Sequence, residues 1–176
     1  MKNLTCLFFG VITMLLIQAC MDKHGKNYNT SVSLDTAAVA FINNGLEGGA
    51  AEIKASGLVI TKSSNQRVIN FAKMMLEDHT KAGDELKKLA GDKHVTVKDT
   101  IYGPHQQAIT ELSAKSGNAF NKAYMQLMLS DHQQAVKLFT NASQNSDPDI
   151  KNFATTTLPT IQMHLDSANA ILTTLK

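Results

Sequence analysis

Apolar residues recur at alternating steps of three and four along almost the whole chain after Leu34, and this spacing predicts amphipathic helices. No stretch shows the strict alternation that is typical of a half-buried strand. Asp35 and Asp147 stand where N-cap residues are expected, and Pro148 suits a first helical turn. The pattern predicts an all-α protein with helices at residues 35–61, 65–90, 104–115 and 119–144 and a last helix that begins at Pro148.

Four of these helices are long, and each can bury its apolar stripe only against the others. We therefore predict a four-helix bundle with a short extra helix between the second and third long helices. The connection after Gly91 is longer than the other two, which is compatible with a crossover between two antiparallel helix pairs. Glycine costs about 1 kcal/mol relative to alanine within a helix. We expect close helix approach to compensate this cost in the first helix, at Gly45, Gly48, Gly49 and Gly57.

The chain contains two similar blocks, "KMMLEDHTKA" at residues 73–82 and "QLMLSDHQQA" at residues 126–135. The blocks align Asp78 with Asp131 and His79 with His132, and both histidines fall on inward-facing positions. A third histidine, His164, lies on the apolar stripe of the last helix. Glu52 lies beside the stripe of the first helix, next to Ile53.

Each of the four long helices thus offers one inward-capable polar residue. A carboxylate and three imidazoles that converge from Glu52, His79, His132 and His164 would suit a single divalent transition metal, such as iron, zinc or manganese. Metal-bound histidines usually donate their other N–H to a carboxylate. We expect Asp78 and Asp131 to accept these bonds, each from a histidine on a neighbouring helix, since adjacent helical residues diverge by about 100°.

An alternative stays open, because buried aspartate and histidine side chains can satisfy one another without metal. The protein would then be a non-enzymatic cell-envelope protein that binds a partner, and the Asp-His pairs would be purely structural. A hydrolase is a weaker alternative, since no serine or threonine lies in a nucleophile-elbow motif. The other three histidines are expected to be solvated, at positions His24, His94 and His105.

The first residues resemble an export signal. Lys2 precedes an apolar run, residues 4–17, that is too short for a confident membrane span. The run ends in "LIQAC", which resembles a bacterial lipoprotein signal with Cys20 as the lipidated residue. We expect a signal peptide at 1–19, a flexible tether at 20–33 and the bundle domain at 34–176, with the protein anchored to the cell envelope. An ordinary secretory signal cut near Ala19 is the alternative.

Cysteine usage and charge exclude several classes of protein. Of the two cysteines, Cys6 lies in the expected signal and Cys20 is the expected lipid site, so no thiol remains for a disulfide or a thiolate metal site. A formal net charge of +2 gives no electrostatic basis for nucleic-acid binding, which requires a clustered basic face. The expected partners are a membrane, reached through the lipid, and a protein of unknown identity.

Several segments, among them "FINNGLEGGAAEIKASGL", "FAKMMLEDHTKA", "AFNKAYMQLMLSDHQQAVKLF" and "DPDIKNFATTTLPTIQMHLDSA", resemble the exported bacterial family called domain of unknown function 4142. The resemblance covers residues 39–172. It implies a ferritin-like bundle, often exported or membrane-attached, with no established activity. It also implies that the metal ligands of ferritin-like proteins correspond here to Glu52, His79, His132 and His164.

The chain departs from working di-iron proteins of this fold, which use Glu-x-x-His on two helices. The residues three positions before His79, His132 and His164 are aliphatic: Leu76, Leu129 and Ile161. The bridging carboxylates are therefore missing. Oxygen activation by a di-iron pair is not expected, and a single-metal site or a vestigial site remains.

Overall fold

The computed structural model describes residues 34–98 and 100–175 and shows an all-helical protein, as predicted. The five helices are α1 (Thr36–Lys62), α2 (Gln66–Asp92), α3 (Gly103–Ser113), α4 (Gly117–Ala142) and α5 (Pro148–Leu172). The starts of all five helices and the ends of the first four differ from the predicted positions by no more than two residues. The predicted signal peptide 1–19, the lipid site Cys20, the tether 20–33 and His24 lie outside the described residues.

Polar side chains fix the starts of the long helices. Asp35 accepts a 2.6 Å hydrogen bond from the N–H of Ala38, and Asp147 accepts bonds from the first N–H groups of α5. Asn65 does the same at the start of α2. These bonds satisfy donors that have no partner within the helix. Within the described part of the chain, no helix is both long enough and apolar enough to cross a bilayer.

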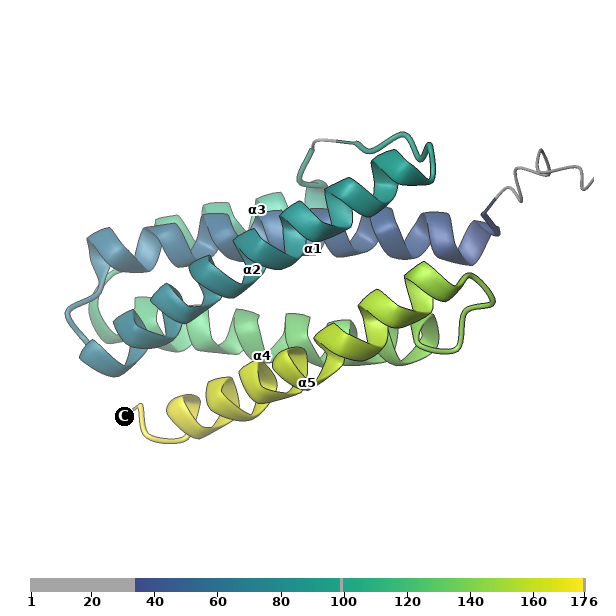
Figure 1. Cartoon of the computed structure of the whole chain (residues 1–176). Helices are drawn as coiled ribbons and strands as arrows, with labels where there is room; N and C mark the ends of the chain where they lie inside the picture. Colours follow the sequence, from purple (N-terminus) through teal and green to yellow (C-terminus); the bar gives the residue numbers. More distant parts are fainter. Residues whose placement is uncertain (1–33, 99, 176) are drawn as a thin grey trace, which may run out of the picture. The chain divides into compact units, whose positions relative to one another are not determined.

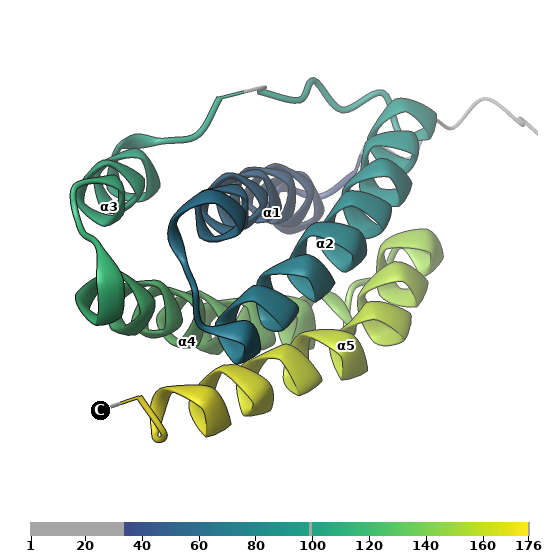
Figure 2. The same ribbon diagram turned by 90° about the vertical axis from the view of Figure 1, so that its left-hand side faces the viewer.

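The four long helices form two antiparallel pairs, α1 with α2 and α4 with α5 (Figure 1). α1 also packs against α4, and α2 against α5. The connection after α2 and the short α3 carry the chain back along the bundle, so that α2 and α4 run in the same direction (Figure 1). α3 lies against α1 and α4 (Figure 2). This confirms the predicted crossover, and one long crossover is the connection found in ferritin-like bundles.

The core consists of two apolar clusters separated by a polar layer. One cluster contains Val68, Phe71 and Met75 of α2 and Phe120 to Met128 of α4. The other contains the beginning of α1, the end of α2 and the beginning of α5. The polar layer consists of Glu52, His79, His132 and His164. Each histidine lies along its helix between the segments that enter the two clusters, whereas Glu52 follows Ala51, which already belongs to the first cluster.

The glycines of α1 fulfil the expectation only in part. A Cβ atom at Gly45 would lie 2.9 Å from Leu86 Cδ2, and one at Gly49 would lie 3.7 Å from His79 Nδ1. Nothing lies within 4 Å of a Cβ at Gly48 or Gly57, so close packing does not explain these two. Gly45 therefore lets α2 approach α1 closely, whereas a Cβ at Gly49 would make only an ordinary contact with His79.

Candidate metal centre

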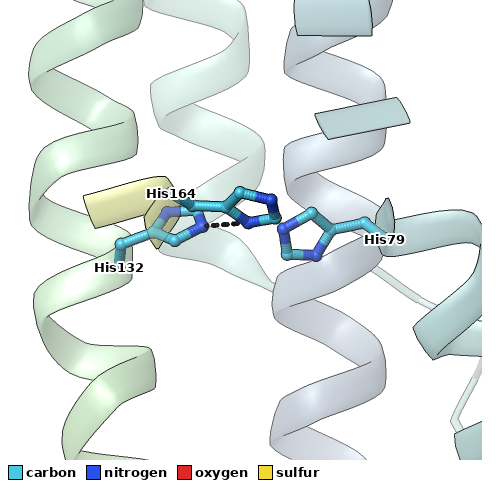
Figure 3. Close-up of side chains that lie close together, drawn as sticks. All are labelled: His79, His132 and His164. Carbon is cyan, nitrogen blue, oxygen red and sulfur yellow. Dashed lines mark hydrogen bonds between the residues drawn. The ribbon is translucent and has the colours of Figure 1, made fainter. Parts of the chain in front are cut away.

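Three buried histidines from three helices meet in the polar layer (Figure 3). His79 comes from α2, His132 from α4 and His164 from α5, and their ring centroids lie 5.3–5.6 Å apart. His132 and His164 are fully buried, and His79 is 7% exposed. One ring nitrogen from each histidine lies within 4.8 Å of the other two. The sequence-predicted convergence of these imidazoles is therefore present.

Hydrogen bonds set the tautomers of two of the rings. His132 Nδ1 lies 2.9 Å from the carbonyl oxygen of Met128, which can only accept, so Nδ1 carries the proton. His164 Nε2 lies 2.8 Å from Asp78 Oδ2 and donates to that carboxylate. In their neutral forms, both rings then carry a lone pair on the remaining nitrogen.

These two remaining nitrogens face each other. His132 Nε2 and His164 Nδ1 are 3.3 Å apart, which is within hydrogen-bond distance (Figure 3). Because the proton of each neutral ring is already committed elsewhere, no proton is left to lie between them. The two lone pairs therefore oppose each other, and a cation between the nitrogens, either a proton or a metal ion, would remove their repulsion.

The third ring, that of His79, presents an unsatisfied atom to the same place. Its Nδ1 lies 3.2 Å from Glu52 Oε2, whereas its Nε2 is buried without a hydrogen-bond partner. Figure 3 shows this ring edge directed toward the other two imidazoles. A buried polar atom without a partner costs about 1–3 kcal/mol. A cation among the three rings would remove that cost.

Burial keeps the histidines neutral at pH 7. Burial, together with His132 and His164, lowers the pKa of His79 to about 3. Burial, together with His164, lowers the pKa of His132 to about 4. Burial also lowers the pKa of His164, and the hydrogen bond to Asp78 opposes this effect. Neutral imidazole is the form that binds metals.

Glu52 lies behind the rings and not among the converging nitrogens. Its oxygens lie 3.2 Å from the Nδ1 atoms of both His79 and His132. Burial, Asp131 and Glu47 raise its pKa well above the usual value. The geometry differs from the predicted direct ligand, because Glu52 stands where a carboxylate orients metal-bound histidines.

The two aspartates of the repeated blocks have different surroundings. Asp78 accepts from His164, a histidine on a neighbouring helix, as expected for a residue that orients a ligand. Asp131 is different, since its Oδ1 lies 3.9 Å from Nε2 of His105 on α3. Burial raises the pKa of Asp131 to about 6, with Glu47 acting in the same direction and His105 opposing it.

The expectation that His105 is solvated is wrong. Its Nδ1 lies 2.9 and 2.8 Å from the two carboxylate oxygens of Glu47, and its side chain is only 29% exposed. The backbone N–H of Tyr102 also donates to Glu47, at 2.8 Å. Sequence reasoning missed this cluster because the crossover places α3 against α1. The position of Glu47 next to the apolar Leu46 was the available signal. His94 is exposed, as expected.

A cavity of about 650 Å³ extends from the group formed by Glu47, His105 and Asp131 to the polar layer. Apolar side chains line much of it, among them Leu46, Leu86 and Phe139. Its titratable lining includes residues of both groups: Glu47, Glu52, His79, His105 and Asp131.

Known proteins support the fold and give the family. The chain is similar to the crystal structure of a DUF305 fragment from Deinococcus radiodurans, with a TM-score of 0.71 and 15% identity over 79% of this chain and 97% of that one. At this identity the likeness shows the fold alone. No curated protein matches the chain. The family model for the domain of unknown function DUF4142 matches residues 26–171. The chain thus belongs to the DUF4142 family.

Proposed function

We propose that the protein binds a single transition-metal cation between His79 Nε2, His132 Nε2 and His164 Nδ1. The supporting observation is that the tautomers of His132 and His164 leave two lone pairs facing each other at 3.3 Å. The unpartnered, buried Nε2 of His79 is the third donor. Glu52 and Asp78 hold the opposite edges of the rings and keep them oriented.

The spacing of the donors suits a metal. Metal–nitrogen bonds of about 2.0–2.1 Å place tetrahedral donor atoms about 3.3 Å from one another. His132 Nε2 and His164 Nδ1 already have this separation. One nitrogen of each ring lies within 4.8 Å of the other two, so a small shift of the rings would bring three donors within bonding distance of one ion.

The chemistry of the donors narrows the choice of metal. Imidazole suits zinc, iron, copper and nickel, whereas magnesium, calcium and manganese favour oxygen donors. With Glu52 turned to the Nδ1 edges, the donor set is all nitrogen, which favours zinc or iron over manganese. Leu76, Leu129 and Ile161 occupy the positions of the bridging carboxylates of di-iron proteins, which favours one metal ion over two.

We also propose that this bundle acts in the cell envelope, anchored by a lipid on Cys20. The support is the "LIQAC" motif at residues 16–20 and the apolar run before it. Metabolic labelling of the expressed protein with a radioactive fatty acid tests the anchor. Wild type is expected to be labelled, and Cys20→Ser is expected not to be.

The metal content of the purified full chain tests the main proposal. The protein is loaded separately with Zn²⁺, Fe²⁺ and Cu²⁺, desalted and measured by mass spectrometry. The wild type is expected to retain near-stoichiometric metal, and His79→Ala/His132→Ala none. His94→Ala is a matched control, because His94 is exposed and is expected to have no effect. Absence of metal from the wild type after loading with Zn²⁺, Fe²⁺ and Cu²⁺ would contradict the proposal.

A second candidate is a partner-binding envelope protein in which the histidines only fasten the helices together. The bond between Asp78 and His164 favours it, because this bond joins α2 to α5 without any metal. This candidate predicts that His79→Gln lowers the melting temperature while wild type and variant both lack metal. The unpartnered Nε2 of His79 favours the metal site over this candidate.

A further inference from the structure

We infer that a cation reaches the three histidines through the cavity beside α3, and that Glu47, His105 and Asp131 form a transit site for it at the outer end. This inference rests on the proposed metal centre. It concerns how the cation enters, whereas the proposed function concerns where the cation stays.

The exposure of the side chains that line the cavity shows which end is closer to solvent. The His105 side chain is 29% exposed, whereas the side chains of His79 and Glu52 are 8% and 6% exposed. All three residues line the same cavity. Of the three proposed ligands, only His79 belongs to its lining, while His132 and His164 are fully buried. A cation that enters past His105 therefore meets Glu52 and His79 first.

The outer end has donors for a divalent cation. Glu47 and His105 lie in contact at 2.8 Å, and Asp131 lies 3.9 Å from the other ring nitrogen of His105. Asp131 is largely buried, with a side chain 12% exposed, and this 3.9 Å contact is its closest ion pair in the described structure. Carboxylates and imidazole are ligands that exchange with the water of a hydrated cation.

The other titratable groups that line the cavity leave it more attractive to cations than to anions. Asp84 adds a carboxylate, and Glu52, whose pKa is raised well above the usual value by burial, lies at the inner end. Lys87 and Lys98 are the ammonium groups of the lining. The Lys98 ammonium lies 6.0 Å from the centre of the Tyr102 ring. Carboxylates thus outnumber ammonium groups along the cavity, and such a cleft raises the local concentration of cations.

A competing route would pass Asp78, whose side chain is 34% exposed. That carboxylate holds His164 Nε2 at 2.8 Å, on the edge of the ring that faces away from the other histidines. A cation entering there would have to break this bond and turn the ring. The cavity route leaves that bond intact, and it reaches the 3.2 Å contact of Glu52 with His79 Nδ1 on a ring whose Nε2 has no partner.

Stopped-flow loading with Co²⁺ tests the route, because tetrahedral Co²⁺ bound to nitrogen absorbs visible light. The metal-free full chain is mixed with Co²⁺, and the absorption is followed to completion. In Glu47→Gln/His105→Gln, the loading rate is expected to fall about tenfold. The final spectrum is expected to match that of the wild type, because neither residue contacts the three histidines. Glu111→Gln is the matched control, since Glu111 makes the same charge change on the exposed face of α3.

A variant that only narrows the cavity tests whether the width of the cavity, apart from its charge, controls the loading rate. Ala135 lines the cavity, and Ala135→Leu narrows it without changing any charge. Loading is expected to be slower in this variant too, with an unchanged final spectrum. Circular dichroism shows whether each variant keeps its helices, and Asp131→Asn replaces Glu47→Gln/His105→Gln if that variant does not.

The outcomes separate the two proposals. Wild type that never develops the Co²⁺ bands contradicts the metal centre, and the route falls with it. If both cavity variants load Co²⁺ at the wild-type rate and reach the wild-type spectrum, the entry route is wrong, whereas the metal centre still stands. Slower loading in Asp78→Asn but not in the cavity variants would also overturn it, in favour of entry past Asp78.

Discussion

His132 Nε2 lies 3.3 Å from His164 Nδ1, and the outer nitrogens of both rings are already hydrogen-bonded to acceptors. Two neutral imidazoles in this arrangement oppose their lone pairs. Each ring is held by a different partner, the Met128 carbonyl for one and the Asp78 carboxylate for the other. The helices that carry these partners therefore fix the arrangement, and attraction between the two rings does not.

The first prediction concerns the tautomers. In metal-free protein at pH 7, we expect His132 to carry its proton on Nδ1 and His164 to carry its proton on Nε2. Burial lowers the pKa of both rings, so both are expected to be neutral. Two-bond ¹H–¹⁵N correlation spectra distinguish the tautomers directly. Addition of Zn²⁺ is expected to shift the unprotonated nitrogen of each ring. A doubly protonated ring at this pH would contradict the assignment.

The second prediction concerns Asp78. Asp78→Asn replaces the ionic acceptor of His164 Nε2 with a neutral one, so the ring is less basic and less firmly oriented. Such outer partners are typically worth about 10–100-fold in metal affinity. A competition titration with a chromophoric chelator and Zn²⁺ should show a loss of this size. Asp166→Asn is the matched control, since Asp166 is exposed on the same helix as His164. Equal affinities of the two variants would refute an orienting role.

The third prediction concerns stability in acid. The pKa of His132 is about 4 in the folded protein and about 6.5 when the chain unfolds. Between these values the unfolded chain binds the proton and the folded protein does not, so stability is lost as pH falls from 6.5 toward 4. At pH 5 this single residue costs about 2 kcal/mol. Glu52 and Asp131 have raised pKa values and act in the opposite direction.

A comparison with His132→Gln isolates the histidine from these opposing groups. In the presence of a chelator, the free energy of unfolding is measured by urea at pH 7 and at pH 5. The wild type is expected to lose about 2 kcal/mol more than the variant between the two pH values. If both proteins lose the same amount, His132 is not kept neutral by the fold.

The fourth prediction concerns a buried pair next to the polar layer. The hydroxyl groups of Ser56 and Tyr124 lie 2.8 Å apart, and both residues are fully buried. Tyr124→Phe leaves the serine hydroxyl without its partner, which costs about 1–3 kcal/mol. Ser56→Ala strands the tyrosine hydroxyl in the same way. We expect the double variant to be less destabilised than the sum of the two, as measured by urea unfolding. Additive losses would show that the bond is not formed.

Helical periodicity was sufficient to predict the positions of the three histidines. His79, His132 and His164 fall in step with neighbours such as Met75 and Met128, so their inward direction followed from spacing. The role of Glu52 was not predictable in this way. Whether its carboxylate meets the inner or the outer nitrogens of the rings depends on side-chain torsions, and no sequence pattern encodes them.

The contact of His105 with Glu47 depends on the crossover. Residues so far apart in sequence meet only because the connection after α2 returns α3 to the side of α1. Sequence periodicity describes the face of one helix and not the position of a short helix on its neighbours. Likewise, Gly45 and Gly57 look equivalent in the sequence, yet only Gly45 meets a side chain of α2.

The division of the ligands between the two helix pairs has a mechanical consequence. His79 belongs to the α1–α2 hairpin, whereas His132 and His164 belong to the α4–α5 hairpin. A cation bound by all three is a cross-link between halves that the chain otherwise joins through one long connection. Parting of the hairpins and release of the ion then become a single event, so the energy of coordination adds to the cost of opening. Amide hydrogens near the mid-point of the bundle would report the ion by exchanging more slowly in its presence.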